Sequence, residues 1–241
     1  MMKIDKLSCS FVGKEILHDI SLEIAEHITI LGANGSGKST LAKAICGLVE
    51  YEGNIEIDTH NVKYLTLKAR AKLLTYIPAK LEVYDPYITV FEFVLLGRFV
   101  YKKSFFDYAN RDKIIAKETL NLLGLAHLKE HSLSSLSSGE AQLVMIAQAI
   151  AQQSKIIIFD EPTANLDPKN TKIIAQRIKA LKEYHKVVLI THDLHLARFI
   201  NSPIAFIKEK KLLYFKEGFF KEENLQKLYD VTFDSMVVKY D

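Results

Sequence analysis

The stretch ITILGANGSGKSTLAKAI, residues 28–45, joins an apolar segment to a helical one through a glycine-rich turn. It fits the pattern GxxxxGK[ST] with Gly32, Ala33, Asn34, Gly35, Ser36, Gly37, Lys38 and Ser39, and Thr40 follows. The apolar residues before the turn predict a strand, and STLAKAICGL after it predicts a helix. This strand–loop–helix context is the one that the pattern requires. The segment therefore predicts a phosphate-binding loop within an α/β fold.

Each residue type in this loop suits an anionic ligand. Glycines let backbone N–H groups curl around phosphate oxygens, and the following helix N-terminus adds positive potential. Lys38 can reach the terminal phosphates of a nucleotide, and the Ser39 hydroxyl can bind Mg²⁺. The alternative is a chance glycine-rich turn, which the correctly placed Lys-Ser pair and the flanking elements disfavour.

The bulk composition is that of a globular protein. The chain has 241 residues, of which 49% are hydrophobic and 25% charged, and this excludes a disordered chain. A net charge of +3 gives no reason to expect nucleic acid as a partner. Cys9 and Cys46 form no metal-binding spacing and fit a reducing compartment. No signal peptide and no run of about 18 apolar residues is present, so any membrane link is expected to come through a partner.

The order of elements predicts an α/β core with a helical insertion. Strands are expected at 6–12, 20–24, 27–32, 53–58 and 73–77, and helices at 89–98, 110–125 and 137–153. Residues 155–200 then alternate strand, helix, strand and helix, which is typical of an α/β core. The strands near 156–159 and 187–190 are uninterrupted apolar runs, as in a sheet covered on both faces.

Acidic and histidine side chains follow two of these apolar strands. KIIIFDEPT places Asp160 and Glu161 at one strand end, and VVLITHD places His192 at another. Ligands of α/β sheets bind beyond the carboxyl ends of the strands, so these residues are expected to face the phosphate loop. Asp160 would hold Mg²⁺ through water, Glu161 would polarise the attacking water, and His192 would bond the γ-phosphate or that water. The alternatives are a pair of solvated acids and a packed or surface histidine.

A fourth stretch, LSSLSSGEAQLVM (133–145), is rich in serine yet runs directly into an apolar helical pattern. It is either a turn that starts a helix or a loop of small residues that lets a ligand approach the backbone. A helix N-terminus with a hydroxyl beside it offers donors to a phosphate.

Taken together, GANGSGKST, LSSGE, IIIFDEPTANLD and ITHD resemble, in this order and spacing, the nucleotide-binding subunit of an ABC (ATP-binding cassette) transporter. The resemblance covers essentially the whole chain, residues 1–241. It implies a P-loop NTPase (RecA-like) core with an N-terminal antiparallel β subdomain and an inserted helical subdomain. The core would comprise 1–85 and 154–241, and the helical subdomain 86–153.

The resemblance also implies an ATP- and Mg²⁺-dependent ATPase that works as a homodimer. Asp160 and Ser39 would bind the metal, and Glu161 and His192 would be catalytic. Phe11 would stack on adenine, although it otherwise reads as a core residue of the first strand. Asp167 would cross to the partner subunit, or else cap a helix ahead of Pro168. One further group would cover the ATP held by the other copy, namely Ser137, Ser138, Gly139 and Glu140.

Several positions depart from the family pattern. Ser138 replaces a signature glycine and would carry strain of about 1 kcal/mol if its φ had to be positive. Glu140 replaces the usual glutamine, and Ala141 stands where a long polar side chain is usual. Ala79, after YIP, replaces a glutamine that binds Mg²⁺ and water in the family. We therefore expect metal coordination through Ser39, Asp160 and waters, and slower or more loosely coupled hydrolysis.

ITVFEFVLLGR, DLHLAR and the tail ENLQKLYDVTFD resemble importer subunits for iron–siderophore complexes, haem and cobalamin. The implied partners are polytopic membrane permease subunits and, indirectly, a substrate-binding protein, with the chain at the cytoplasmic face of the cell membrane. The aromatic run at 100–108 is either part of the permease-docking surface or a packed loop. Two alternatives for the whole chain are a soluble cassette ATPase acting on ribosomes or DNA, and a regulatory nucleotide-binding module with little turnover.

Overall fold

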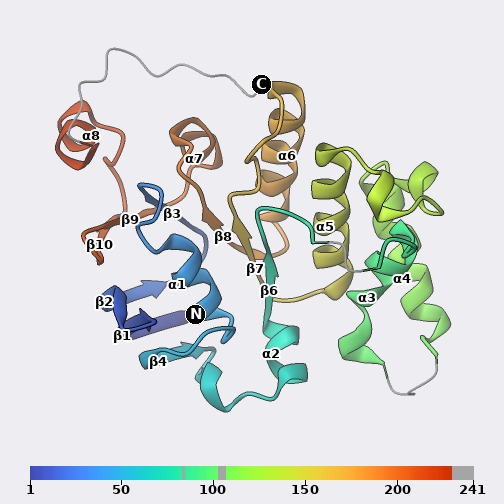
Figure 1. Ribbon diagram of the computed structural model, residues 1–241, viewed down its shortest axis with the longest axis horizontal. Coiled ribbons are helices and arrows are strands. Elements are labelled where there is room, and N and C mark those ends of the chain that lie inside the picture. The colour runs from blue at the N-terminus through green and yellow to red at the C-terminus, as the bar shows by residue number, and fades with distance from the viewer. Residues whose placement is uncertain (83–84, 103–106, 230–241) are drawn as a thin grey trace.

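A six-stranded sheet forms the centre of the molecule (Figure 1). The structure is a computed structural model that describes residues 1–82, 85–102 and 107–229. In spatial order the strands are β10 (Lys211–Phe215), β9 (Ile204–Lys208), β3 (Ile28–Gly32), β8 (Lys186–Ile190), β7 (Ile156–Asp160) and β6 (Leu74–Ile77). All neighbours pair in parallel except β10, which is antiparallel to β9. The carboxyl ends of β3, β8 and β7 therefore lie side by side at one edge.

Both faces of this sheet are covered, as its apolar strands predict. Along β7 the side chains alternate between two apolar clusters. Ile157 and Phe159 join one cluster, and Ile156 and Ile158 join the other. The first cluster is shared with α5 (Ser138–Gln152), α6 (Pro168–Leu181) and α7 (Leu194–Ile200). The second is shared with α1 (Lys38–Ile45) and the N-terminal sheet.

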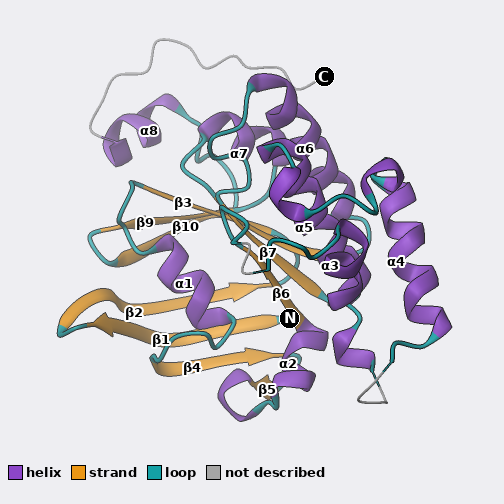
Figure 2. Cartoon of the chain, turned by 45° about the vertical axis from the view of Figure 1, so that its right-hand side comes forward, coloured by secondary structure: helices purple, strands orange, loops and turns teal. Residues whose placement is uncertain are grey.

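That N-terminal sheet is antiparallel and lies against α1 (Figure 2). Its spatial order is β2 (Lys14–Ile24), β1 (Met2–Phe11), β4 (Glu52–Ile57) and β5 (His60–Asn61). At the start of β1, buried Met2 and Ile4 alternate with exposed Lys3 and Asp5, so one face of the sheet packs on the core. The two sheets and α1 together fix the position of the glycine-rich loop that follows β3.

Three helices pack together between β6 and β7 in the chain, namely α3 (Val90–Leu96), α4 (Asn110–Leu122) and α5. A buried arginine joins them. Arg98, just after α3, donates from Nε to Asp112 Oδ1 at the start of α4 (2.9 Å) and from Nη1 to the carbonyl of Ala151 at the end of α5 (2.7 Å). Its guanidinium also lies 3.9 Å from the centre of the Tyr101 ring. The helices are therefore tied at one end by a single charged side chain.

The remaining elements include two that the sequence patterns do not predict. Helix α2 (Leu67–Leu73) has no buried residue, so its sequence lacks the apolar periodicity that predicts a helix. The β9–β10 hairpin turns at Glu209 and Lys210, whose φ angles are 53° and 66°. Such turns usually carry Asn-Gly, and that signal is missing here. The other elements are α8 (Glu222–Tyr229) and the 3₁₀ turns Val62–Tyr64, Phe99–Tyr101, Ala126–Leu128 and Leu133–Ser135.

Two sequence-based hypotheses fall partly outside the described residues. Of the aromatic run at 100–108, residues 103–106 lie outside them, while Val100 is buried and the rings of Tyr101 and Tyr108 are each covered by a cation. This described part of the run is packed. The tail beyond Tyr229 likewise lies outside the described residues.

Candidate functional site

The glycine-rich loop leads from β3 into α1 with a backbone that only glycine fits at its last turn. Gly37 caps α1 with φ = 100°, a left-handed conformation. A Cβ added there would lie 2.8 Å from Cδ2 of Leu17 in β2. Both the dihedral angle and the close approach of the N-terminal sheet therefore require glycine. The loop residues Ala33, Asn34 and Gly35 are exposed.

Lys38, the first residue of α1, is buried at 5% exposure. Its ammonium donates to the carbonyls of Gly32 (2.9 Å) and Ala33 (3.0 Å). An ammonium has three N–H donors, so one remains for an anion within the loop. Ser36 Oγ is also buried here and has no hydrogen-bond partner among the described residues. A phosphate oxygen would satisfy both groups, so the loop fits a nucleotide phosphate.

Asp160 ends β7 beside this loop and is 4% exposed, which overturns the alternative of a solvated acid. Its Oδ1 accepts a hydrogen bond from Ser39 Oγ (3.0 Å) and its Oδ2 accepts one from the Tyr76 hydroxyl (2.8 Å). Burial, followed by this bond to Asp160, raises the pKa of Tyr76, so the phenol stays protonated and donates. Hydroxyl and carboxylate oxygens are ligands of hard cations, and the Ser39–Asp160 pair therefore fits Mg²⁺.

Glu161 follows directly and bridges the loop to His192. Its Oε1 lies 3.6 Å from Lys38 Nζ, and its Oε2 lies 2.9 Å from His192 Nδ1. The Glu161 backbone has φ = 49°, unusual for a residue with a Cβ, and its N–H is fixed on the carbonyl of Ile190 (2.8 Å). The side chain is only 16% exposed. A carboxylate held in this way can accept a proton from a water in front of the loop.

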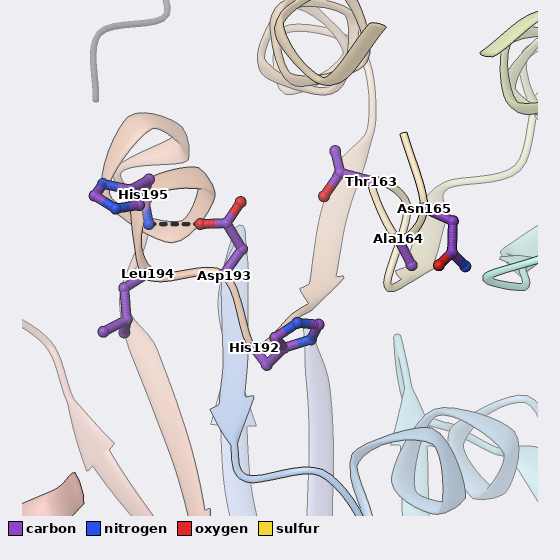
Figure 3. A pocket seen from close by; sticks show the side chains of 7 residues that line it. All are labelled: Thr163, Ala164, Asn165, His192, Asp193, Leu194 and His195. Carbon is purple, nitrogen blue, oxygen red and sulfur yellow. Dashed lines mark hydrogen bonds between the residues drawn. The ribbon is translucent and has the colours of Figure 1, made fainter. Parts of the chain in front are cut away.

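A cavity of about 540 Å³ opens beside the His192 side chain (Figure 3). Its lining comes from the segment after Glu161 and from the segment after β8, with the His192 ring lying between the two. In the segment after β8, Asp193 Oδ1 accepts a hydrogen bond from the backbone N–H of His195 (2.8 Å). The lining residues are Thr163, Ala164, Asn165, His192, Asp193, Leu194 and His195.

The serine-rich stretch is the N-terminus of α5. Ser137 caps the helix, since its Oγ accepts from the N–H of Glu140 (3.4 Å) while its own N–H donates to the Glu140 carboxylate (2.9 Å). The Ser137 hydroxyl also donates to that carboxylate (2.6 Å), and these bonds hold the pKa of Glu140 below its ordinary value. Ser138 lies inside the helix, so the strain expected from a positive φ is absent.

Asp167 caps α6 in the same manner, as the helix-cap interpretation predicts. Its Oδ1 accepts from the N–H of Asn170 (2.9 Å), and its Oδ2 accepts from the Asn170 amide (2.7 Å). The Asn170 side chain packs against Gly139, where an added Cβ would lie 2.6 Å from Asn170 Cγ. The N-termini of α5 and α6 are therefore in direct contact.

The expected site residues thus form two groups. The loop from Gly32 to Thr40, Asp160, Glu161 and His192 are joined by hydrogen bonds and ion pairs. Ser137, Ser138, Gly139 and Glu140 gather with Asp167, and within the described residues no hydrogen bond links them to the first group. Phe11 is 70% exposed at the end of β1, so the core interpretation of this residue is wrong.

The sequence analysis does not predict the capping bonds between Ser137 and Glu140, and it does not name Tyr76 or Asn170. Ser137-x-x-Glu140 before an apolar run is the sequence signature of a capping box and could have been read as one. Tyr76 and Asn170 carry no such signal. Their contacts depend on how β6 pairs with β7 and on how α5 packs against α6.

The fold and the first group of residues define a P-loop nucleotide-binding protein. The sequence model of the ABC transporter family matches residues 17–164. An ABC transporter ATP-binding protein of Methanocaldococcus jannaschii is 33% identical over 96% of this chain and 92% of its own length. An iron chelatin transport ATP-binding protein of Helicobacter pylori is 31% identical over 98% and 95%. A manganese transport ATP-binding protein of Halalkalibacterium halodurans is 30% identical over 89% and 85%.

Solved structures agree with these relatives. A chain described as part of a metal-chelate type ABC transporter in an inward-facing conformation matches with a TM-score of 0.83 and 25% identity, covering 96% of this chain and 89% of that one. A dimeric ATP-binding cassette with bound ADP and inorganic phosphate matches with a TM-score of 0.79 and 28% identity, covering 91% and 100%. The chain belongs to the ABC transporter family, and it is an ATPase of that type.

Proposed function

We propose that this chain powers an importer for a metal or metal-chelate cargo of the iron–siderophore, haem or cobalamin kind, and that Glu161 and His192 carry out its ATP hydrolysis. The observation that carries the chemical part is that Glu161 forms an ion pair with Lys38 and a hydrogen bond with His192, beside the hydrogen-bonded pair of Ser39 and Asp160. It brings a phosphate-binding ammonium, a candidate base and a metal-binding pair to one edge of the sheet.

In this proposal the loop N–H groups, Lys38 and Ser36 hold the phosphates of ATP. Ser39 and Asp160 hold Mg²⁺, which neutralises phosphate charge when bound. Glu161 orients the attacking water and accepts its proton, while the His192 ring fixes the Glu161 carboxylate and can donate to the γ-phosphate. Phe11, exposed near the loop end of the N-terminal sheet, is available to stack on adenine.

Two copies would be needed for turnover. The second group of residues presents a helix N-terminus and a serine hydroxyl, but it is not joined to the first group of its own chain. In the proposed dimer this surface would cover the ATP that is bound to a second copy. The solved dimeric cassette supports such pairing. Asp167 would then lie at the crossing between the copies.

Membrane subunits complete the proposed assembly. No helix in the described part of the chain has the length and apolarity to cross a bilayer. The relatives named for iron chelatin and manganese transport support an importer at the cytoplasmic face of the membrane, with permease subunits and a substrate-binding protein as partners. We assign residues 86–153, the helical subdomain, as the part that meets the permease.

The Glu161→Gln variant tests the chemical part. Removing the base should lower ATPase turnover by at least about 10²-fold, because a positioned general base contributes roughly 10²–10⁴-fold. The affinity for ATP should stay within about twofold. Glu183→Gln, at an exposed position beyond α6, is the control and should keep full turnover. Unchanged turnover in Glu161→Gln would contradict the proposal and favour a regulatory module.

Co-purification tests the transport part. The chain, carrying an affinity tag and expressed at its native level, should bring down a polytopic membrane protein, and vesicles holding that complex should take up a metal chelate only when ATP is supplied. Recovery of the chain on ribosomes instead of with a membrane protein would contradict this part.

A further inference from the structure

Tyr76 is a polar side chain of β6 that reaches the proposed metal site. In the sheet, Tyr76 pairs with Ile158 of β7, and Asp160 lies two residues beyond Ile158. Side chains two residues apart on a strand share a face, so Tyr76 and Asp160 lie on the same side of the sheet. The Tyr76 hydroxyl is 2.8 Å from Asp160 Oδ2.

This bond leaves neither carboxylate oxygen of Asp160 unattached. Oδ1 accepts from Ser39 Oγ and Oδ2 accepts from Tyr76, while the residue itself is 4% exposed. With a donor on each oxygen, rotation of the carboxylate about its χ2 torsion breaks at least one hydrogen bond. The orientation of the group is therefore fixed from two strands and a helix at once.

We propose that Tyr76 is a positioning residue of the ATPase site, which fixes the Asp160 carboxylate for a divalent cation bound with the nucleotide. The inference deepens the proposed function and rests on it. Partners that orient a metal-binding carboxylate typically change metal affinity by about 10- to 100-fold when they are removed. Because the metal is expected to contact Asp160 through water, the effect of Tyr76 belongs at the lower end of that range.

The position of Tyr76 also bears on Ala79. Strand β6 ends at Ile77, and Ala79 is exposed with a side chain that offers no donor or acceptor. Tyr76, three residues earlier, is the side chain on this strand that touches Asp160. It also lines a cavity of about 450 Å³ together with Pro78, Phe93 and Gln148, so it stands between that cavity and the metal-binding carboxylate.

The test compares Tyr76→Phe with Tyr51→Phe. Both remove one phenol oxygen and keep the ring, and Tyr51 OH is buried without a hydrogen-bond partner among the described residues. The measurement is Mn²⁺ binding, followed by electron paramagnetic resonance, to protein saturated with adenylyl imidodiphosphate. We expect Tyr76→Phe to raise the dissociation constant of Mn²⁺ about tenfold and Tyr51→Phe to change it less than twofold.

Two further measurements distinguish a positioning role of Tyr76 from a general loss of structure. Binding of the nucleotide analogue in EDTA should stay within about twofold in both variants, since among the described residues the hydrogen bond of the Tyr76 hydroxyl goes to Asp160 and not to the phosphate loop. Without nucleotide both variants should still unfold in one cooperative transition, with Tyr76→Phe melting at the lower temperature because it loses a hydrogen bond to a buried carboxylate. Equal Mn²⁺ affinities in the two variants would overturn the inference, as would a parallel loss of metal-free nucleotide binding. The wild-type ATPase rate separately tests the proposed function, because Mn²⁺ binding to the analogue requires no hydrolysis.

Discussion

Glu161 has an unfavourable backbone conformation, and this conformation determines where its carboxylate lies. A left-handed φ in a residue other than glycine costs on the order of 1–2 kcal/mol, and here it is fixed by the bond of the Glu161 N–H to Ile190. The turn directs the carboxylate between Lys38 and His192 instead of along the strand. Residues held in such conformations are enriched at functional sites, which agrees with the proposed role of Glu161.

Ala79 gives a prediction at the same scale. Ala79→Gln supplies an amide at the end of β6, and we expect turnover to rise up to about tenfold if that amide gains one hydrogen bond to a charged group in the transition state. Steady-state ATPase rates would show it, with Ala126→Gln at another exposed position as the control. An unchanged or lower rate in Ala79→Gln would count against the expected role of this position.

Among the elements, the N-termini of α5 and α6 work as a pair. Each is capped by its own side chain, Ser137 for α5 and Asp167 for α6, and each cap holds a residue three positions later. Gly139 and Asn170 bring the two ends into contact. Residues 137–140 therefore have a structural role within their own chain as well as the proposed role toward a second copy.

Gly139→Ala tests whether that contact is what requires glycine. The new Cβ would clash with the Asn170 side chain and push the N-termini of α5 and α6 apart, so we expect ATPase activity to fall at least about tenfold. Adding Asn170→Ala removes the atoms that the Cβ meets and should restore most of the activity in the double variant. If the double variant stays inactive, glycine is required at 139 by the phosphate and not by α6.

The buried arginine between α3, α4 and α5 gives a prediction for stability. Asp112→Ala leaves the Arg98 charge buried without its carboxylate, and we expect the free energy of unfolding to fall by about 3–5 kcal/mol. Urea denaturation measures it. Glu23→Ala, which breaks the exposed pair with Lys3, should cost no more than about 1 kcal/mol. Equal losses in the two variants would contradict the structural role of Arg98.

The elements that carry motifs were predictable because their signals are local. The loop after β3, the acids after β7 and the histidine after β8 each follow an apolar strand, and parallel strands bring such ends together. The features that the sequence analysis missed or predicted wrongly have no local signal in the sequence. Phe11 is apolar yet exposed, because it sits where β1 ends, and the bond from Tyr76 to Asp160 depends on a strand register that the sequence of β6 does not display. The β9–β10 hairpin turns on Glu209 and Lys210, residues that do not mark a turn.

At the scale of the whole molecule, the two groups of site residues would complete one ATP site if two copies of the chain met. The phosphate loop, whose residues Ala33, Asn34 and Gly35 are exposed, and its acids form the proposed ATP site of one chain. The caps of α5 and α6 form a surface whose helix N-terminus and hydroxyl suit a phosphate. Pairing two chains head to tail would give each loop the cap of the other copy, and the interface would form around two ATP molecules. We therefore expect dimerisation to depend on nucleotide.

The most direct test of an ATP site shared by two copies uses the Ser137→Arg variant. Its ATPase rate and its affinity for ATP are measured on the same preparation. The arginine blocks the surface that should cover the ATP of the second copy, while the phosphate loop of its own chain is untouched. Tyr184→Arg, at an exposed position beyond α6, is the control. We expect Ser137→Arg to lose hydrolysis, to keep ATP binding by the single chain within about twofold, and to no longer dimerise with ATP. Normal turnover in Ser137→Arg would contradict it.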